Sequence, residues 1–116
     1  MPTLKTITFD KLNMDVDFVV GKNAKENFEI IDDASDNHIW FHVKGTSSSH
    51  VIAHLEDNLN KKDLRYIVKQ GAILCKQHSK MASSKNVEII YTKVCNVTKT
   101  DIQGTVNVIN QKSIII

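Results

Sequence analysis

The sequence predicts a single α+β (mixed α/β) domain, with a mixed or largely antiparallel sheet and two main helices. Three observations predict this class. Alternating apolar and polar residues mark several short strands, clearest over residues 3–9, 15–20 and 39–43. Apolar residues at helical spacing mark a long helix over residues 61–80. The chain has 116 residues and no internal repeat, which indicates one domain over residues 1–116.

The first quarter of the chain predicts a hairpin followed by a helix. Residues 3–9 and 15–20 alternate as strands do, and residues 10–14 form the connecting loop. Asn23 is placed to cap the following helix, and Glu26 stands three residues on, as in a capping box. The acidic run that begins at Asp32 ends the helix, because late acidic residues oppose its dipole. The side expected to be buried consists of Ala24, Phe28 and Ile31.

The stretch over residues 37–52 predicts a second hairpin that carries polar aromatic side chains. Ile39, Phe41 and Val43 share one face, which we expect to be core. A small-residue turn, Gly45 to Ser49, precedes the second alternating run. The other face then forms a surface able to stack and to bind anions, unless the tryptophan is core and the histidines fix the turn. That face consists of Trp40, His42, Lys44, His50 and His54.

The helix predicted over residues 61–80 separates an apolar stripe from a basic stripe. Asn60 is its expected cap. Acidic partners are nearly absent, whereas an ordinary solvated helix face mixes both signs. Residues 1–60 carry a net charge of −5 and residues 61–100 one of +7, so an anionic partner is expected there. The basic stripe consists of Lys62, Arg65, Lys69, Lys76 and Lys80.

The last third of the chain predicts strands. Residues 87–97 are rich in β-branched side chains and predict one long strand. Residues 105–109 and 113–116 are expected to pair with each other. Cys75 and Cys95 lack metal-binding spacing and are expected to be reduced thiols. Ser49 and His50 are neighbours on a strand, so they point to opposite faces and do not form a nucleophile–base pair.

Several motifs resemble the NFACT-R domain, the RNA-binding module of ribosome quality-control factors, in matching order over roughly residues 16–116. Trp40 to Lys44 followed by Ser49 to Ile52 is similar to its signature, and Val20 to Asn27 to its Gly-Lys-Asn-Ala segment. The later matching blocks are Ser79-Lys80, Ser83 to Val87, Tyr91 to Lys93 and Asn96 to Lys99.

The sequence also departs from the family pattern. His38 stands where the family has an acidic residue. Ser47 to His50 stands where the family commonly has a Pro-Gly-Ser-His turn. The sequence of this chain is closer here to that of the family's small coiled-coil-containing animal relative. Residues 100–104 stand where the family has a Gly-Ala-Lys-Pro-Gly loop and lack that sequence. Any contact that the family makes through this loop is therefore not expected of this chain.

The resemblance and the charge pattern together predict a nucleic-acid-binding module without catalytic residues, metal or cofactor, and without a membrane segment. The resemblance implies structured RNA, tRNA or ribosomal RNA, in a cytoplasmic setting like ribosome quality control, with the large ribosomal subunit as a further partner. A DNA-binding module, or an enzyme acting on nucleic acid through His42 or His50, remains the alternative. The expected binding residues are Lys22, Asn23, Trp40, His42, Lys44, Ser49, His50, Lys62, Arg65, Lys69, Lys76, Lys80, Ser84, Lys85 and Lys93.

Overall fold

A six-stranded antiparallel sheet forms the centre of the computed structural model, which describes all residues 1–116. Its strand order is β1-β2-β4-β3-β5-β8, and a separate two-stranded sheet pairs β6 with β7. The predicted α+β class, with two main helices, is therefore confirmed. The elements are β1 (Thr3–Phe9), β2 (Met14–Gly21), α1 (Ala24–Asp32), β3 (Ile39–Val43), β4 (His50–His54), α2 (Lys61–Gln77), β5 (Glu88–Lys93), β6 (Val97–Lys99), β7 (Val106–Val108) and β8 (Lys112–Ile115).

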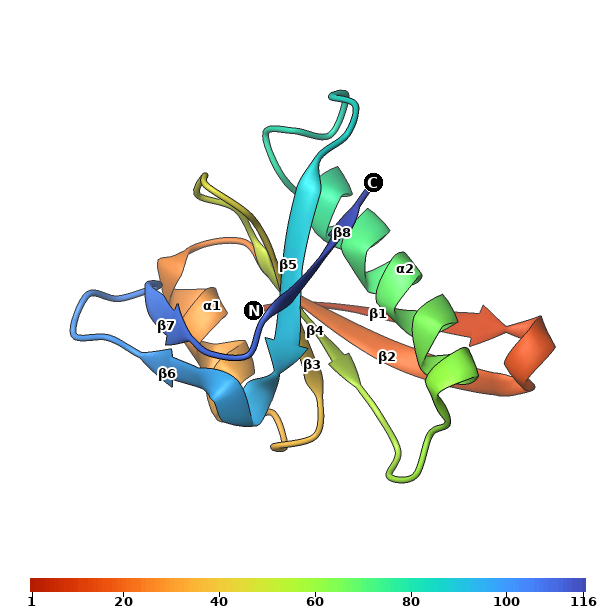
Figure 1. The fold of residues 1–116 in the computed structure, drawn as a ribbon. Helices are drawn as coiled ribbons and strands as arrows, with labels where there is room; N and C mark the ends of the chain where they lie inside the picture. The colour runs from red at the N-terminus through yellow and green to blue at the C-terminus, as the bar shows by residue number, and fades with distance from the viewer.

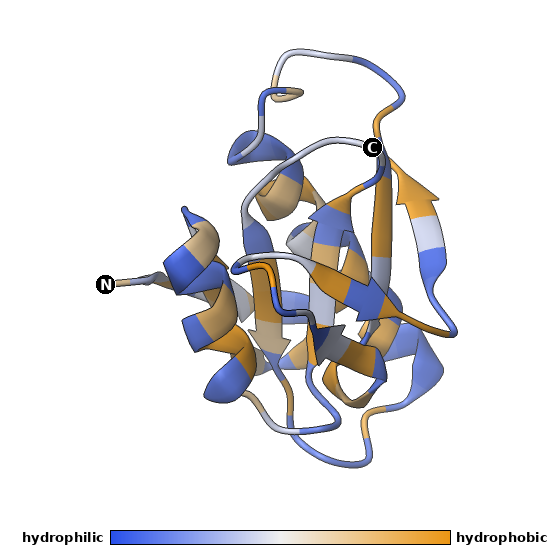
Figure 2. Cartoon of the chain, turned by 90° about the vertical axis from the view of Figure 1, so that its left-hand side faces the viewer, coloured by the Kyte–Doolittle hydropathy of each residue, from blue (hydrophilic) through white to orange (hydrophobic).

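The large sheet is covered on both faces (Figure 1). Helix α2 packs on one face, over the larger core cluster, which includes Phe18, Phe41 and Ile67. Helix α1 and the β6–β7 hairpin lie on the other face, over a smaller cluster that contains Trp40 and Ile52. Figure 2 views this second side, where hydrophobic and hydrophilic positions alternate around α1, as expected of a helix with one buried side.

Both helices begin as the sequence predicts. The Asn23 side chain accepts a hydrogen bond from the Glu26 N–H at 2.9 Å, and Asn60 accepts one from the Asp63 N–H at 2.8 Å. Each cap satisfies one of the N–H groups that a helix start leaves free. Within α1, Ile31 is buried but Ala24 is exposed, so part of its expected buried side is wrong. Neither helix combines the length and apolar character needed to cross a membrane.

Three predictions about the later elements are wrong. Helix α2 ends at Gln77 rather than at residue 80, because Ser79 donates its hydroxyl to the Lys76 carbonyl at 2.7 Å and closes the helix. The strand predicted over residues 87–97 is interrupted by a 3-10 turn at Val94–Asn96, after which the chain leaves the large sheet. The two last strands do not pair with each other: β7 pairs with β6, and β8 with β5.

Candidate functional site

A cavity of about 760 Å³ opens between the second face of the sheet and four peripheral segments. The β2–α1 junction contributes Lys22 and Asn23 to its wall. The end of α2 contributes His78, Ser79 and Lys80, and the β6–β7 hairpin contributes residues 103–106 and Val108. The fourth segment is the β3–β4 loop, residues 45–49. Since these segments are far apart in sequence, the cavity exists only in the folded chain.

Three aromatic rings from β3 and β4 form the floor of this cavity. Trp40 and His42 stack with ring centroids 5.7 Å apart and planes 10° from parallel. His50 stands edge-on to both, with its centroid 5.3 Å from that of Trp40 and 5.0 Å from that of His42. Trp40 is 1% exposed and His50 3%, whereas His42 is half-buried. The floor is therefore closely packed and mostly sealed from solvent.

Hydrogen bonds hold His50 in one orientation and one tautomer. Its Nδ1 accepts a bond from Trp40 Nε1 at 3.1 Å. An indole N–H only donates, so Nδ1 carries no proton and the neutral ring is protonated at Nε2. The backbone N–H of His50 donates to Asn27 Oδ1 at 3.0 Å. Gly21 permits this approach, because a Cβ there would lie under 3.0 Å from Asn27 Oδ1.

The histidines around the cavity are neutral at physiological pH. Burial lowers the pKa of His42 below its ordinary value. Burial, and next the proximity of His42, lower the pKa of His50 to about 3. The pKa of His78 is lowered by burial and then by the charges of Lys5 and Lys22. The permanent positive charges of the cavity wall are therefore those of Lys22 and Lys80.

The β3–β4 loop offers backbone donors rather than hydroxyl groups. Ser49 donates its hydroxyl to the His78 carbonyl at 3.2 Å, and Ser48 accepts a bond from the Val43 N–H at 3.2 Å. These two side chains fix the loop. By contrast, the N–H groups of residues 47–49 donate to no other protein group.

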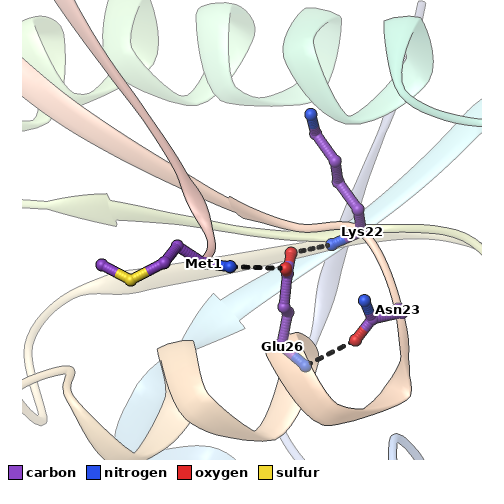
Figure 3. A network of polar contacts seen from close by, with 4 residues as sticks. All are labelled: Met1, Lys22, Asn23 and Glu26. Carbon is purple, nitrogen blue, oxygen red and sulfur yellow. Dashed lines mark hydrogen bonds and ion pairs between the residues drawn. The ribbon is translucent and has the colours of Figure 1, made fainter.

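The cavity wall contains no carboxylate, although residues 1–60 are acidic as a whole. The nearest glutamate in α1, Glu26, accepts a hydrogen bond from the Lys22 N–H and pairs with the Met1 amino group at 3.3 Å (Figure 3). The same view shows the Lys22 side chain pointing away from that carboxylate. The wall therefore suits an anion and disfavours a cation.

The structure brings seven of the fifteen predicted residues together in this cavity. The other eight lie outside it. Lys62, Arg65 and Lys69 are exposed on the outer face of α2, and the half-buried Lys76 reaches the Ile116 carbonyl oxygen at 3.4 Å. Lys44 pairs with Glu88, Lys93 is exposed at the end of β5, and Ser84 and Lys85 lie in the α2–β5 loop. The seven cavity residues are Lys22, Asn23, Trp40, His42, Ser49, His50 and Lys80.

The open aromatic surface expected on the polar face of β3 and β4 does not form. Helix α1 and the β6–β7 hairpin cover that face, so Trp40 presents no free ring face on which a base can stack. His54 lies at the opposite end of β4 from His50 and stacks on His38 with ring centroids 4.5 Å apart. The expected surface does not form because a second layer covers this face of the sheet. The alternation of apolar and polar residues along a strand does not reveal whether such a layer is present.

Sequence reasoning missed several cavity residues. Asn27 closes the matched Val20–Asn27 motif, but the motif assigns no role to it. His78 falls within the helix predicted over residues 61–80, whereas it lines the cavity just after α2 ends. Gln103, Gly104 and Thr105 line the cavity although their loop departs from the family pattern. No local sequence signal identifies that loop as part of the wall.

Comparisons with known proteins identify the family and support the fold. A family model described as the NFACT protein RNA-binding domain matches residues 5–109. Mouse coiled-coil domain-containing protein 25 is 32% identical over 83 residues, which cover 70% of this chain and 40% of that protein. The C-terminal structure of the fibronectin/fibrinogen-binding protein from Streptococcus suis superposes with a TM-score of 0.81 at 26% identity, covering 99% of this chain and 44% of that one. The chain thus spans less than half the length of either relative.

Proposed function

Because the chain belongs to the NFACT protein RNA-binding domain family, we propose that it binds structured RNA, either tRNA or ribosomal RNA, in a context like ribosome quality control. The proposal includes a cytoplasmic setting and contact with the large ribosomal subunit. Family membership supports nucleic-acid binding in general. The choice of structured RNA rests on the resemblance between the Trp40 and His50 motifs and those of ribosome quality-control factors.

One observation carries the proposal: the exposed cations of α2 have no ion-pair partners, and Lys80, just after the helix, lines the cavity. The three ion pairs of the structure join Met1 to Glu26, Lys44 to Glu88 and Lys99 to Asp32. None of them involves a residue of α2 or Lys80. Cations that are neither buried nor paired are available to phosphates, which provide most of the affinity in nucleic-acid binding. Lys85 and Lys93 are further exposed cations after the helix.

The decisive variant is Arg65→Glu with Lys69→Glu, in the exposed part of the helix. A matched control is Lys112→Glu on β8, compared with Lys69→Glu alone so that each variant reverses one charge. We expect the helix variant to bind tRNA more weakly than the control. Its plot of log affinity against log salt should become shallower by about 1 for each RNA phosphate that the variant no longer neutralises. Equal affinities and equal salt slopes would remove α2 from the proposal.

The DNA-binding alternative is tested in the same assay. Phosphate contacts alone do not distinguish RNA from DNA, whereas contacts to the 2′-hydroxyl do. We expect tRNA to bind more tightly than duplex DNA or single-stranded DNA at the same salt concentration. Tighter binding of either DNA would favour the alternative. The enzyme alternative is tested by incubating tRNA with the protein and analysing the RNA by electrophoresis. An enzyme of this kind would cleave the RNA, and His42→Ala or His50→Ala would abolish the cleavage.

A further inference from the structure

We propose that the cavity binds one unpaired nucleotide of the RNA, with its phosphate at the β3–β4 loop and the start of α1, and its base toward the floor. This inference rests on the proposed function and names what the cavity adds to it. The α2 cations would hold the backbone of any folded RNA. The cavity would select RNA that offers a nucleotide outside a base pair.

Both segments of the wall assigned to the phosphate carry backbone donors without a protein partner. The N–H groups of residues 47–49 have no protein partner. At the start of α1, Asn23 satisfies the N–H groups of Glu26 and Asn27, which leaves those of Ala24 and Lys25 free. A helix start also carries partial positive charge, which favours a phosphate there. The ammonium groups of Lys22 and Lys80 add two full charges to the same wall.

Two nearly buried side chains also direct unused donors at the cavity. His50 is 3% exposed, and its Nε2–H has no protein partner because Nδ1 takes the bond from Trp40. Asn27 is 6% exposed, and its Nδ2 has no partner because Oδ1 takes the bond from the His50 N–H. The one fully enclosed side-chain atom without a partner in the protein is His54 Nε2, so neither of these donors is sealed off. Buried donors are normally paired, and a ligand in the cavity would pair both.

The size and the wall of the cavity fit a nucleotide better than a bare anion. Its volume of about 760 Å³ lies in the range of small-molecule pockets, roughly 300–1,000 Å³. Ile90, Val106 and Val108 supply apolar surface beside the His42 ring. A phosphate ion makes no use of such a surface, whereas the flat face of a base does. His42 is neutral, so burying it against a base involves no desolvation of a charge.

An unpaired nucleotide fits because protein segments bound the cavity on four sides. A base within a duplex has its pairing edge occupied and brings the second strand with it. The floor is also sealed by the stacked rings of Trp40 and His42, so nothing threads through it. Access is therefore limited to a nucleotide from a loop, a bulge or a strand end.

Trp40 is the single tryptophan of the chain and lies in the cavity floor, so its fluorescence reports occupancy. The purified protein is titrated with AMP, CMP, GMP and UMP, and separately with adenosine, uridine and inorganic phosphate. We expect saturable binding of at least one mononucleotide, at least tenfold tighter than its nucleoside and than phosphate. Phosphate binding as tight as every nucleotide, or no saturable nucleotide binding, would overturn the proposal.

Substitution of His50 locates the site. His50→Asn keeps an oxygen that accepts from Trp40 Nε1 and removes the Nε2–H donor, so we expect at least tenfold weaker nucleotide binding by calorimetry. Unchanged affinity in this variant would overturn the assignment. Should it not fold, as judged by circular dichroism, Lys22→Ala with Lys80→Ala is tested instead, with the same expected loss and the same contrary result. Lys112→Glu on β8 serves as the control for both.

The two proposals fail in different ways. Protein that binds tRNA but shows no saturable mononucleotide binding overturns the cavity assignment and leaves the proposed function standing. Protein that binds a mononucleotide but not tRNA overturns the proposed function and supports a site for a free nucleotide. A bulged or looped RNA should compete with the mononucleotide for Trp40, whereas a blunt duplex should not. Equal competition by both would contradict selection of an unpaired nucleotide.

Discussion

Replacing His50 with Asn should reduce the loss of folding stability below neutral pH. In the folded protein, burial and then the proximity of His42 lower the pKa of His50 from 6.5 to about 3. The unfolded chain takes up this proton near the ordinary value, so between these two pKa values the unfolded state binds more protons. The free energy of unfolding contributed by the neutral ring is therefore fully present above about pH 6.5 and is lost as the pH falls toward 3.

The size of this effect follows from the shift. One pKa unit corresponds to about 1.4 kcal/mol, and a shift of this size implies a loss of about 2 kcal/mol between pH 7 and pH 5 from His50 alone. Burial also lowers the pKa values of His38, His42 and His78, so the wild-type protein should lose more than this. Those three histidines remain in His50→Asn, and the difference between the two proteins isolates His50.

Urea unfolding of both proteins at pH 7, 6 and 5 measures the effect, provided that the denaturant slopes agree. We expect His50→Asn to lose about 2 kcal/mol less than wild type over that range. The variant keeps an acceptor for Trp40 Nε1, so its fold should tolerate the change. Parallel pH profiles for the two proteins would refute the reasoning, because they would mean that His50 titrates alike in the folded and unfolded states.

Two further predictions concern the larger core. Gly71→Ala should lower the free energy of unfolding by about 1–3 kcal/mol, because a Cβ there would lie under 3.0 Å from three atoms of the buried Phe41 ring; urea unfolding measures this, with Gln70→Ala as control, and equal stability would contradict the packing. Burial raises the pKa of the Cys75 thiol to about 12, whereas Cys95 is exposed. A thiol reagent should therefore label only Cys95 until urea unfolds the chain, and rapid labelling of Cys75 would count against its burial.

Local patterns predicted the elements of the first two-thirds of the chain well. Asn23 and Asn60 cap their helices as expected, because a cap depends only on residues three positions away. The β1–β2 and β3–β4 pairings also formed as predicted, since a short connection leaves antiparallel neighbours few alternatives. The larger errors come after Val94, where the chain turns out of the large sheet. Before it, α2 ends at Gln77 rather than at residue 80, and Ala24 is exposed. A β-branched run has the same composition whichever sheet it joins.

The seven predicted residues that line the cavity were suggested by motifs, but their positions were not. Alternation in β3 showed that Trp40 and His42 share a face, without showing whether solvent or a second layer covers it. The layer that covers it comes from α1 and from the β6–β7 hairpin, which are distant in sequence from both strands. Exposure of a side chain depends on what packs over it, and that depends on the whole fold.

Amino-acid order by itself determined which chemistry this chain carries: helix cations with few acidic neighbours, histidines and a tryptophan in short motifs, and few carboxylates after residue 60. Only the tertiary structure decided that Asn27, His50 and the loop of residues 46–49 surround one cavity, with donors left unpaired inside it. The physical reason is the separation in sequence of the residues that determine each feature. Caps, turns and periodicity are set within a few residues, whereas a cavity is the space left between segments that meet only after the chain has folded.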